Sequence, residues 1–193
     1  MPRINSENFY KNAIKKHGLS PMGVCWLSYE HQQIRFETIR AMLPEDLSCV
    51  SLVDAGCGFG DFFTYLQNTQ SLPQTYIGID SIDTMCEIAR KKTSSKIIHA
   101  DIAKATLPVV DYYICSGALN VLTAFESHLF IRNCYKSSKK GFIFNALCGD
   151  KKSQTYNYLS REAIKKIADK LQVGKLIFTD NYLDNDISVG FFS

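Results

Sequence analysis

Three glycines alternate with other residues directly after an apolar run, in the segment SLVDAGCGFGDFF (51–63). Gly56, Gly58 and Gly60 allow the backbone to turn sharply and a ligand to lie directly against the main chain. A tight turn without a ligand would need one such glycine, not three. The pattern also departs from the GxGxxG loop that binds a dinucleotide pyrophosphate, because Asp61 stands where that loop has its last glycine.

Acidic residues on both sides of the glycines indicate the charge of the ligand. Asp54 precedes them and Asp61 follows them, at the start of the expected helix. Carboxylates at these positions repel a diphosphate and favour a ligand that carries positive charge. S-adenosylmethionine carries a sulfonium and an α-ammonium group and no phosphate, so it suits this setting. A dinucleotide-dependent oxidoreductase on a similar fold is the alternative that Asp61 disfavours.

Short apolar runs alternate with helical patterns along most of the chain. Strands are expected over residues 49–56, 75–80, 96–101, 109–116 and 141–148, and helices over 31–43, 81–92, 125–136 and 160–172. No helix fits between the last two strand candidates, 175–183 and 187–193, so they should form a hairpin with one antiparallel strand. The sequence therefore predicts an α/β fold with a doubly wound, mostly parallel, Rossmann-like sheet and a C-terminal antiparallel hairpin strand.

Four segments in order carry a resemblance to a known family. VDAGCGFGDF (53–62) looks like motif I of the class I S-adenosylmethionine-dependent methyltransferases, and YIGIDSIDTM, IIHADI and DYYICSGALNVL resemble their next three motifs. The resemblance covers roughly residues 48–193. It predicts a single domain over 1–193, in which 1–47 form a helical N-terminal cover and 48–193 form the Rossmann-like core.

The resemblance also implies which residues bind the cofactor. In this family an acid at the end of the second strand holds both ribose hydroxyls, and Asp80 occupies that position. Asp101 would face the adenine amino group, Ile102 the ring, and Ser116 and Gly117 the mouth of the cleft. The expected set in these motifs is Asp54, Ala55, Gly56, Cys57, Gly58, Gly60, Phe62, Asp80, Ser81, Met85, Asp101, Ile102, Ser116 and Gly117.

The helix expected over 31–43 has polar residues close to its apolar stripe. On a helical wheel Gln32 falls on the centre of that stripe and Arg35 falls beside it. Arg35 is either part of a structural salt bridge or the partner of the cofactor's methionine carboxylate, a task that family members often give to an N-terminal basic residue. Trp26 is either a core anchor or a wall over the cofactor or the acceptor.

The predicted function is methyl transfer from S-adenosylmethionine to an unidentified acceptor, with a small molecule as the first choice. The fourth motif reads SGAL, where many enzymes that methylate amino groups have [DN]PPY, and Leu119 and Asn120 beside it are expected in the substrate wall. Nucleic acid stays open as an acceptor, because residues 89–96 and 136–140 are basic, although a net charge of +3 is too small to indicate it. A non-catalytic or regulatory S-adenosylmethionine-binding protein of the same fold is the main alternative.

The remaining sequence features assign no catalytic residue and no metal. The histidines His17, His31, His99 and His128 lie in no motif that demands a base. The seven cysteines include no CxxC pair, so a zinc site is not expected and the thiols should be reduced, as in the cytoplasm. The N-terminus does not read as a secretory signal, and no apolar stretch approaches the length of a membrane span.

Overall fold

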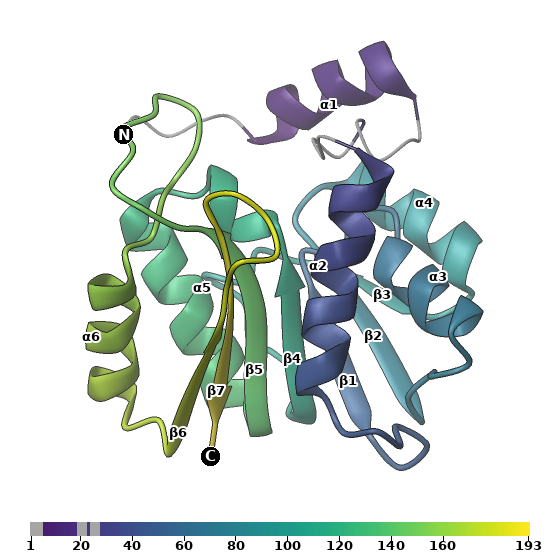
Figure 1. Ribbon diagram of the computed structural model, residues 1–193. Coiled ribbons are helices and arrows are strands. Elements are labelled where there is room, and N and C mark those ends of the chain that lie inside the picture. The colour runs from purple at the N-terminus through teal and green to yellow at the C-terminus, as the bar shows by residue number, and fades with distance from the viewer. Residues whose placement is uncertain (1–5, 19–22, 24–27) are drawn as a thin grey trace.

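The computed structural model describes residues 6–18, 23 and 28–193, which form a sheet with helices on both sides (Figure 1). The strands are β1 Ser51–Ala55, β2 Thr75–Asp80, β3 Lys96–His99, β4 Val110–Ser116, β5 Ser138–Leu147, β6 Lys175–Thr179 and β7 Asp186–Phe192. The helices are α1 Ser6–His17, α2 Tyr29–Met42, α3 Asp61–Asn68, α4 Asp83–Thr93, α5 Ala124–Ser137 and α6 Arg161–Leu171, and a 3₁₀ turn covers Ala118–Val121.

Within the described residues the sheet has seven strands in the order β3-β2-β1-β4-β5-β7-β6. Strands β1 to β5 pair in parallel, whereas β7 pairs antiparallel with both β5 and β6. The predicted doubly wound, mostly parallel sheet with its antiparallel C-terminal strand is therefore confirmed. Strand β1 pairs with β2 on one side and β4 on the other, so the strand order reverses beside it, where such sheets bind ligands.

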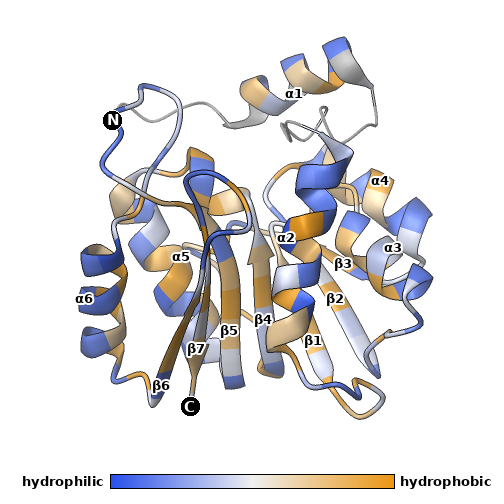
Figure 2. Cartoon of the chain, in the orientation of Figure 1, coloured by the Kyte–Doolittle hydropathy of each residue, from blue (hydrophilic) through white to orange (hydrophobic). Residues whose placement is uncertain are grey.

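Each face of the sheet packs against its own set of helices. On one face Leu52 packs with Phe36 of α2 and Leu66 of α3, and α4 packs beside them against β2 and β3. On the other face Val53 shares a core with Ile131 of α5 and with α6. Successive residues of a strand point to opposite faces, which explains why strands buried on both sides are continuously apolar. Figure 2 shows the same division on α6, which is apolar toward the sheet and hydrophilic outside.

Side chains at the helix starts satisfy N–H groups that no helical carbonyl can reach. Thr123 and Glu126 form a capping box at the start of α5, and Ser160 accepts a hydrogen bond from the N–H of Ala163 at the start of α6. The segment predicted as an N-terminal cover divides in two. Helix α1 lies beyond the C-terminal ends of the parallel strands (Figure 1), whereas α2 packs on the sheet face through Phe36 and Ile39.

Candidate functional site

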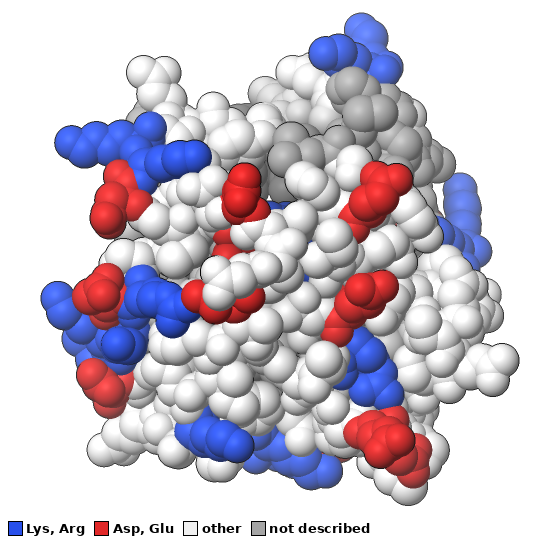
Figure 3. Space-filling model, viewed as in Figure 1, with Lys and Arg blue, Asp and Glu red and all other residues white. Residues whose placement is uncertain are grey.

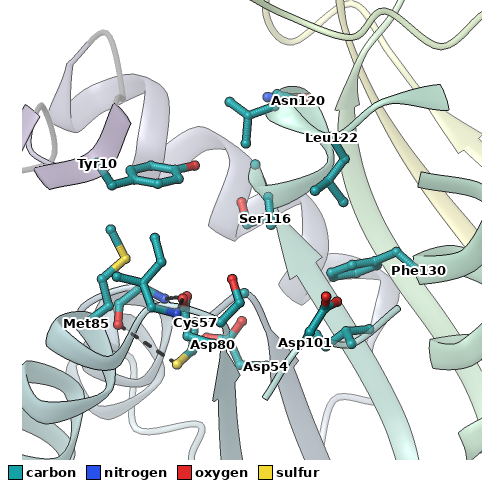
Figure 4. Close-up of a pocket in the computed structure, with 18 of the residues that line it drawn as sticks. Tyr10, Asp54, Cys57, Asp80, Met85, Asp101, Ser116, Asn120, Leu122 and Phe130 are labelled. Atoms are coloured by element: carbon teal, nitrogen blue, oxygen red, sulfur yellow. Dashed lines mark hydrogen bonds between the residues drawn. The ribbon is translucent and has the colours of Figure 1, made fainter. Parts of the chain in front are cut away.

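A cavity of about 960 Å³ opens at the C-terminal edge of the parallel strands. Figure 4 shows Asp54, Cys57 and Asp80 at the ends of the strands, with Tyr10 and Asn120 on the opposite side of the cleft. Its volume lies at the upper end of the usual range for ligand pockets, roughly 300–1,000 Å³. The predicted residues that it brings together are Asp54, Gly56, Cys57, Gly58, Phe62, Asp80, Ser81, Met85, Asp101, Ile102, Ser116, Gly117, Arg35 and Asn120.

The glycine-rich loop is fixed to the end of β2 by its own backbone. The N–H groups of Gly56 and Cys57 donate to the carbonyl oxygen of Ile79 at 2.7 and 3.1 Å, and the N–H of Gly58 donates to Oδ2 of Asp80 at 2.9 Å. Gly58 has a φ of 53°, in the left-handed region that favours glycine. The loop is therefore held in one conformation against the predicted ribose-binding acid.

Gly60 has a packing role and does not line the cavity. Its φ is 78°, and a Cβ added there would lie 2.4 Å from Cγ2 of Thr93 at the end of α4. The third glycine of the pattern is thus required for the close approach of the loop to α4.

Asp80 is a buried carboxylate held by backbone donors. It is 7% exposed, and its Oδ1 accepts a hydrogen bond from the N–H of Ile82 at 2.9 Å, opposite the bond from Gly58. Burial raises its pKa, while the backbone N–H groups oppose that shift. Each carboxylate oxygen keeps a second lone pair, so the group can also accept hydrogen bonds from a ligand.

Asp54 forms a buried pair with Tyr76 beneath the loop. The Tyr76 hydroxyl donates to Oδ2 of Asp54 at 2.6 Å, and Asp54 is 3% exposed. Burial raises the pKa of Asp54 to about 7, because the loss of hydration outweighs the stabilising hydrogen bond from Tyr76, and the nearby Asp80 and Asp61 raise it further. Asp54 therefore titrates close to neutral pH.

The loop after β3 contributes Asp101 and Ile102 to the cavity. Oδ1 of Asp101 accepts from the N–H of Ala103 at 3.0 Å. Helix α5 holds the same loop, because Nδ2 of Asn133 donates to the carbonyl oxygens of Ile102 and Ala103 at 2.9 and 3.2 Å. Asn133 is thus a supporting residue that the sequence motifs did not indicate.

Helix α2 brings two polar side chains to the site, as its wheel pattern predicted: Gln32, which is buried, and Arg35, whose side chain is 11% exposed. Gln32 is 2% exposed and its Nε2 donates to Oδ2 of Asp61 at 3.1 Å. Arg35 forms an ion pair with Asp186, at the start of β7, and also lines the cavity. Burial lowers the pKa of Arg35 to about 10, so it remains a cation at neutral pH. The structural salt bridge that the sequence left open is present, whereas a role toward the cofactor carboxylate stays a prediction.

A chain of buried polar groups runs behind the site from Arg35 to Ser116. The Tyr182 hydroxyl donates to Oδ1 of Asp186 at 2.6 Å and lies 2.8 Å from Oγ of Ser188. Asn145 bridges onward, donating to Oγ of Ser188 and accepting from Oγ of Ser116, the latter at 2.7 Å. Sequence reasoning missed this chain, although one asparagine and one serine interrupting apolar strands are a recognisable signal.

Four predicted site residues are not among the lining residues described. Ala55 is fully buried and Leu119 is 1% exposed, both in the core on the α5 side of the sheet, and Gly60 packs on α4. The alternation along β1 turns Asp54 to one face and Ala55 to the other. Trp26 lies outside the described residues.

The lining also includes aromatic and aliphatic residues that the sequence analysis did not assign to the site. Tyr10 comes from α1 and Phe59 from the glycine-rich loop. Leu122 comes from the turn before α5, Phe125 from the first turn of α5, and Tyr156 from the segment after β5. Phe125 and Tyr156 are 71% and 37% exposed. Large exposed aromatic residues would have been the signal, but exposure cannot be read from the sequence.

No catalytic base or reactive thiol can be assigned in the cavity from these contacts. Of the histidines considered as bases, His99 lines it, with Nε2 3.1 Å from the carbonyl oxygen of Ser81. Burial raises the pKa of the Cys57 thiol well above its ordinary value, so it stays neutral. Among residues 6–18, 23 and 28–193, no group of three or more His, Cys, Asp and Glu side chains could hold a metal ion, and no helix is long and apolar enough to cross a membrane.

Comparisons with known proteins bear on the sequence and on the fold. Residues 52–141 match the family described as a methyltransferase domain, and no curated protein matches the sequence. The chain is similar to magnesium protoporphyrin IX methyltransferase from Synechocystis PCC 6803, solved with bound SAM, at 14% identity and a TM-score of 0.71 over 100% of this chain and 99% of that one. A SAM-dependent methyltransferase from Leishmania major is 19% identical, with a TM-score of 0.70 over 96% of this chain and 83% of that one. A SAM-dependent methyltransferase from Mesorhizobium loti is 16% identical, with a TM-score of 0.61 over 81% of this chain and 96% of that one. At such low identities these likenesses show the fold alone.

The fold and the matched segment of the sequence agree on the class of protein. The chain has the Rossmann-like fold of the class I S-adenosylmethionine-dependent methyltransferases. Residues 52–141, just under half of the chain, match a methyltransferase domain, and such a domain implies S-adenosylmethionine as its cofactor. The resemblance, the fold class and the cofactor predicted from the sequence are confirmed.

Proposed function

We propose that the protein is an enzyme that transfers a methyl group from S-adenosylmethionine to a small-molecule acceptor. The observation that carries the proposal is the carboxylate of Asp80, buried at the end of β2 and fixed by the N–H groups of Gly58 and Ile82. A rigid carboxylate at this position suits two ribose hydroxyls. The whole chain is proposed to act as one domain, and its location in the cytoplasm stays a prediction.

The cavity lining fits the parts of the cofactor. Gly56 and Gly58 would contact its methionine half, Asp80 its ribose, and Asp101 and Ile102 its adenine. Arg35 would bind the methionine carboxylate, since the five N–H donors of a guanidinium can serve Asp186 and a ligand together. When bound, the cofactor supplies an activated methyl group on a sulfonium leaving centre. The task of the protein is then to orient the acceptor and exclude water.

Two features support a small molecule as the acceptor. The cavity has room for ligand-sized groups and carries aromatic side chains at its mouth. The basic runs that left nucleic acid open are partly engaged within the protein: Lys92 pairs with Asp61, and Lys140 lies 3.3 Å from Asp111. On the face drawn in Figure 3, Lys and Arg stand in separate groups with Asp and Glu between them.

Calorimetry with S-adenosylhomocysteine tests the cofactor half of the proposal. The wild type should bind it, and Asp80→Asn should weaken binding by about tenfold or more, because two hydrogen bonds to a charged group contribute about 1.5–3 kcal/mol each. A 2′,3′-dideoxy analogue should bind wild type and variant equally. If the analogue binds wild type as tightly as S-adenosylhomocysteine does, Asp80 does not hold the ribose.

Transfer itself needs a separate measurement. Labelled S-adenosylmethionine incubated with the protein and a cell extract should yield a labelled small molecule. Binding of the cofactor without any transfer would favour the alternative, a non-catalytic or regulatory protein. Label in nucleic acid would overturn the choice of acceptor.

A further inference from the structure

The side-chain amide of Asn120 is held in a single orientation. Its Oδ1 accepts a hydrogen bond from the backbone N–H of Leu147, at 2.9 Å. Because a backbone N–H can only donate, this bond fixes which end of the amide faces β5. The opposite atom, Nδ2, is therefore directed away from β5, on a residue that lines the cavity and is 9% exposed.

This amide presents a hydrogen-bond donor that the protein itself does not use. Within the described part of the chain, Nδ2 of Asn120 donates to no protein acceptor. The atom is not fully buried, so a ligand can reach it. A donor on a side chain that is nine-tenths buried carries a free-energy cost unless a ligand or water accepts from it. The side-chain NH2 group of Asn120 is therefore positioned to donate a hydrogen bond to a ligand.

The backbone around Asn120 is also fixed. Its N–H donates to the carbonyl oxygen of Gly117 at 3.1 Å, and its own carbonyl accepts from the N–H of Asn157 at 2.8 Å. Asn157 is held in turn, because its Nδ2 donates to Oγ of Ser127 at 3.0 Å. Asn120 is thus preorganised, which lowers the entropic cost of binding a ligand.

The cavity that contains this donor has aromatic side chains in its lining, which suit an aromatic ring. Tyr10, Phe125 and Tyr156 line the cavity from three separate segments, together with Leu122. Phe125 is 71% exposed, although burying such a side chain is favourable. Figure 4 shows Tyr10, Asn120 and Leu122 around the side of the cleft that lies opposite Asp80.

The charge of the lining disfavours an anion. Among the described residues the cavity is lined by five acidic side chains, Asp54, Asp61, Asp80, Asp101 and Glu126, and by two basic ones, Arg35 and Lys104. Both basic groups are paired with carboxylates, Arg35 with Asp186 and Lys104 with Asp101. An acceptor that carries a carboxylate or phosphate would meet net repulsion.

We propose that Nδ2 of Asn120 binds the reacting oxygen of a neutral phenol, so that the cavity O-methylates an uncharged aromatic hydroxyl compound. This inference rests on the proposed methyltransferase function. A hydroxyl oxygen has two lone pairs, so it can accept from Asn120 with one and attack with the other. The single lone pair of a neutral amine would be blocked by the same hydrogen bond.

The step balances without any further reagent. A lone pair of the phenol oxygen forms a bond to the methyl carbon of S-adenosylmethionine, and the carbon–sulfur bond breaks with its electron pair left on sulfur. The phenol proton, whose pKa is about 10 in the comparable tyrosine side chain, leaves to water. The products are an aryl methyl ether, S-adenosylhomocysteine and a proton. Because the phenol proton passes to water before the new bond is complete, the oxygen carries partial negative charge in the transition state, and the amide of Asn120 stabilises that charge.

Binding of naphthalene derivatives to the S-adenosylhomocysteine complex tests the proposal. Wild type should bind 2-methoxynaphthalene, whose oxygen can only accept, about tenfold more tightly than naphthalene or 2-naphthoate. With labelled S-adenosylmethionine it should methylate 2-naphthol and not 2-naphthylamine. Equal binding of the three probes, no binding, or faster methylation of the amine would overturn the proposal. This series needs no variant.

Two matched variants locate the effect. In Asn120→Asp one oxygen can keep the bond to Leu147, while the cavity-facing donor becomes an acceptor, so the preference for 2-methoxynaphthalene over naphthalene should disappear. Asn157→Asp lies outside the cavity lining and should keep the preference within about twofold, because the Ser127 hydroxyl can donate to the new carboxylate. A preference that survives in Asn120→Asp would overturn the proposal.

Each variant is first titrated with S-adenosylhomocysteine alone. A wild type that fails this titration contradicts the proposed function. If the wild type binds S-adenosylhomocysteine but shows no preference among the naphthalene probes, the result contradicts the proposed phenol acceptor and leaves the proposed cofactor binding intact.

Discussion

At the scale of single residues, the Asp54–Tyr76 pair couples stability to pH. The pKa of Asp54 is about 7 in the folded protein and near its ordinary value of 3.8 in the unfolded chain. Between these values the folded state binds more protons than the unfolded state, so stability should fall as pH rises from about 4 to about 7. The contribution of one such group is at most about 1.4 kcal/mol per pH unit.

Urea unfolding of wild type and Asp54→Asn at several pH values measures this effect. The variant should lose the slope that Asp54 contributes, whereas other buried carboxyls, such as Asp80, contribute equally to both proteins. Tyr76→Phe removes a hydrogen bond that lowers the pKa of Asp54, so its pH window should extend upward. Identical pH profiles for wild type and Asp54→Asn would contradict the shifted pKa.

Arg35 allows a second prediction at this scale. If its guanidinium binds the methionine carboxylate, Arg35→Ala should weaken the binding of S-adenosylhomocysteine by about 1.5–3 kcal/mol. The binding of 5′-methylthioadenosine, which lacks that carboxylate, should not change. Calorimetry with both ligands gives the comparison.

Asp186→Asn is the matched control, because it breaks the ion pair but keeps the guanidinium. It should preserve the preference for S-adenosylhomocysteine over 5′-methylthioadenosine. If it loses that preference as fully as Arg35→Ala does, Arg35 acts by holding α2 to β7 and not by contact with the ligand.

The sequence predicted the acids at the strand ends better than their partners. Asp80 and Asp101 follow apolar runs at positions that the motifs define, and both reach the cavity. Asn145 of β5 lies far from those motifs and meets Ser116 only because β4 and β5 pair in this register, and it meets Ser188 through the β5–β7 pairing. Tyr182, in the loop before β7, contacts Ser188 in turn. A contact that depends on register across a sheet leaves no local pattern in the chain.

At the scale of elements, the junction between the glycine-rich loop and α4 depends on Gly60. A Cβ at this position would lie 2.4 Å from Cγ2 of Thr93, and the φ of 78° disfavours any side chain. Gly60→Ala should therefore lower the free energy of unfolding by about 1–3 kcal/mol, measured by urea denaturation.

A second substitution separates the steric clash from the backbone strain. Thr93→Ser removes Cγ2 but keeps the hydroxyl that donates to the carbonyl oxygen of Ala89. The double variant should be more stable than Gly60→Ala alone. Equal stability of the two would mean that φ alone explains the glycine.

Element type followed from periodicity, whereas element ends depended on neighbours. The expected strand over 141–148 begins earlier, at Ser138, because Ser138 pairs with Val110 across a register shift in β4. The expected helix over 31–43 extends back to Tyr29, where Ser28 accepts from the N–H of His31. Strand pairing and capping contacts form only in the folded protein. The apolar pattern of the sequence therefore predicts the ends of helices and strands only approximately.

At the scale of the whole molecule, the cofactor site joins segments from most of the chain. It takes residues from α2, from the ends of β1, β2 and β4, and from the loop after β3. A ligand that binds only when these segments are assembled stabilises the folded state by mass action. Thermal unfolding therefore reports on the identity of the ligand.

S-adenosylhomocysteine at about a hundred times its Kd should stabilise the protein by about 2.7 kcal/mol. For a chain of this size, each kcal/mol corresponds to a rise in Tm of about 2–4 °C, so we expect a rise of roughly 5–11 °C. NAD at the same concentration should produce no rise, because Asp61 stands where a diphosphate loop has glycine, and Asp54 lies beneath the loop. Differential scanning fluorimetry with both ligands makes the comparison. A rise with NAD and none with S-adenosylhomocysteine would favour an oxidoreductase, and equal rises would mean that the acidic residues around the glycines do not select the ligand.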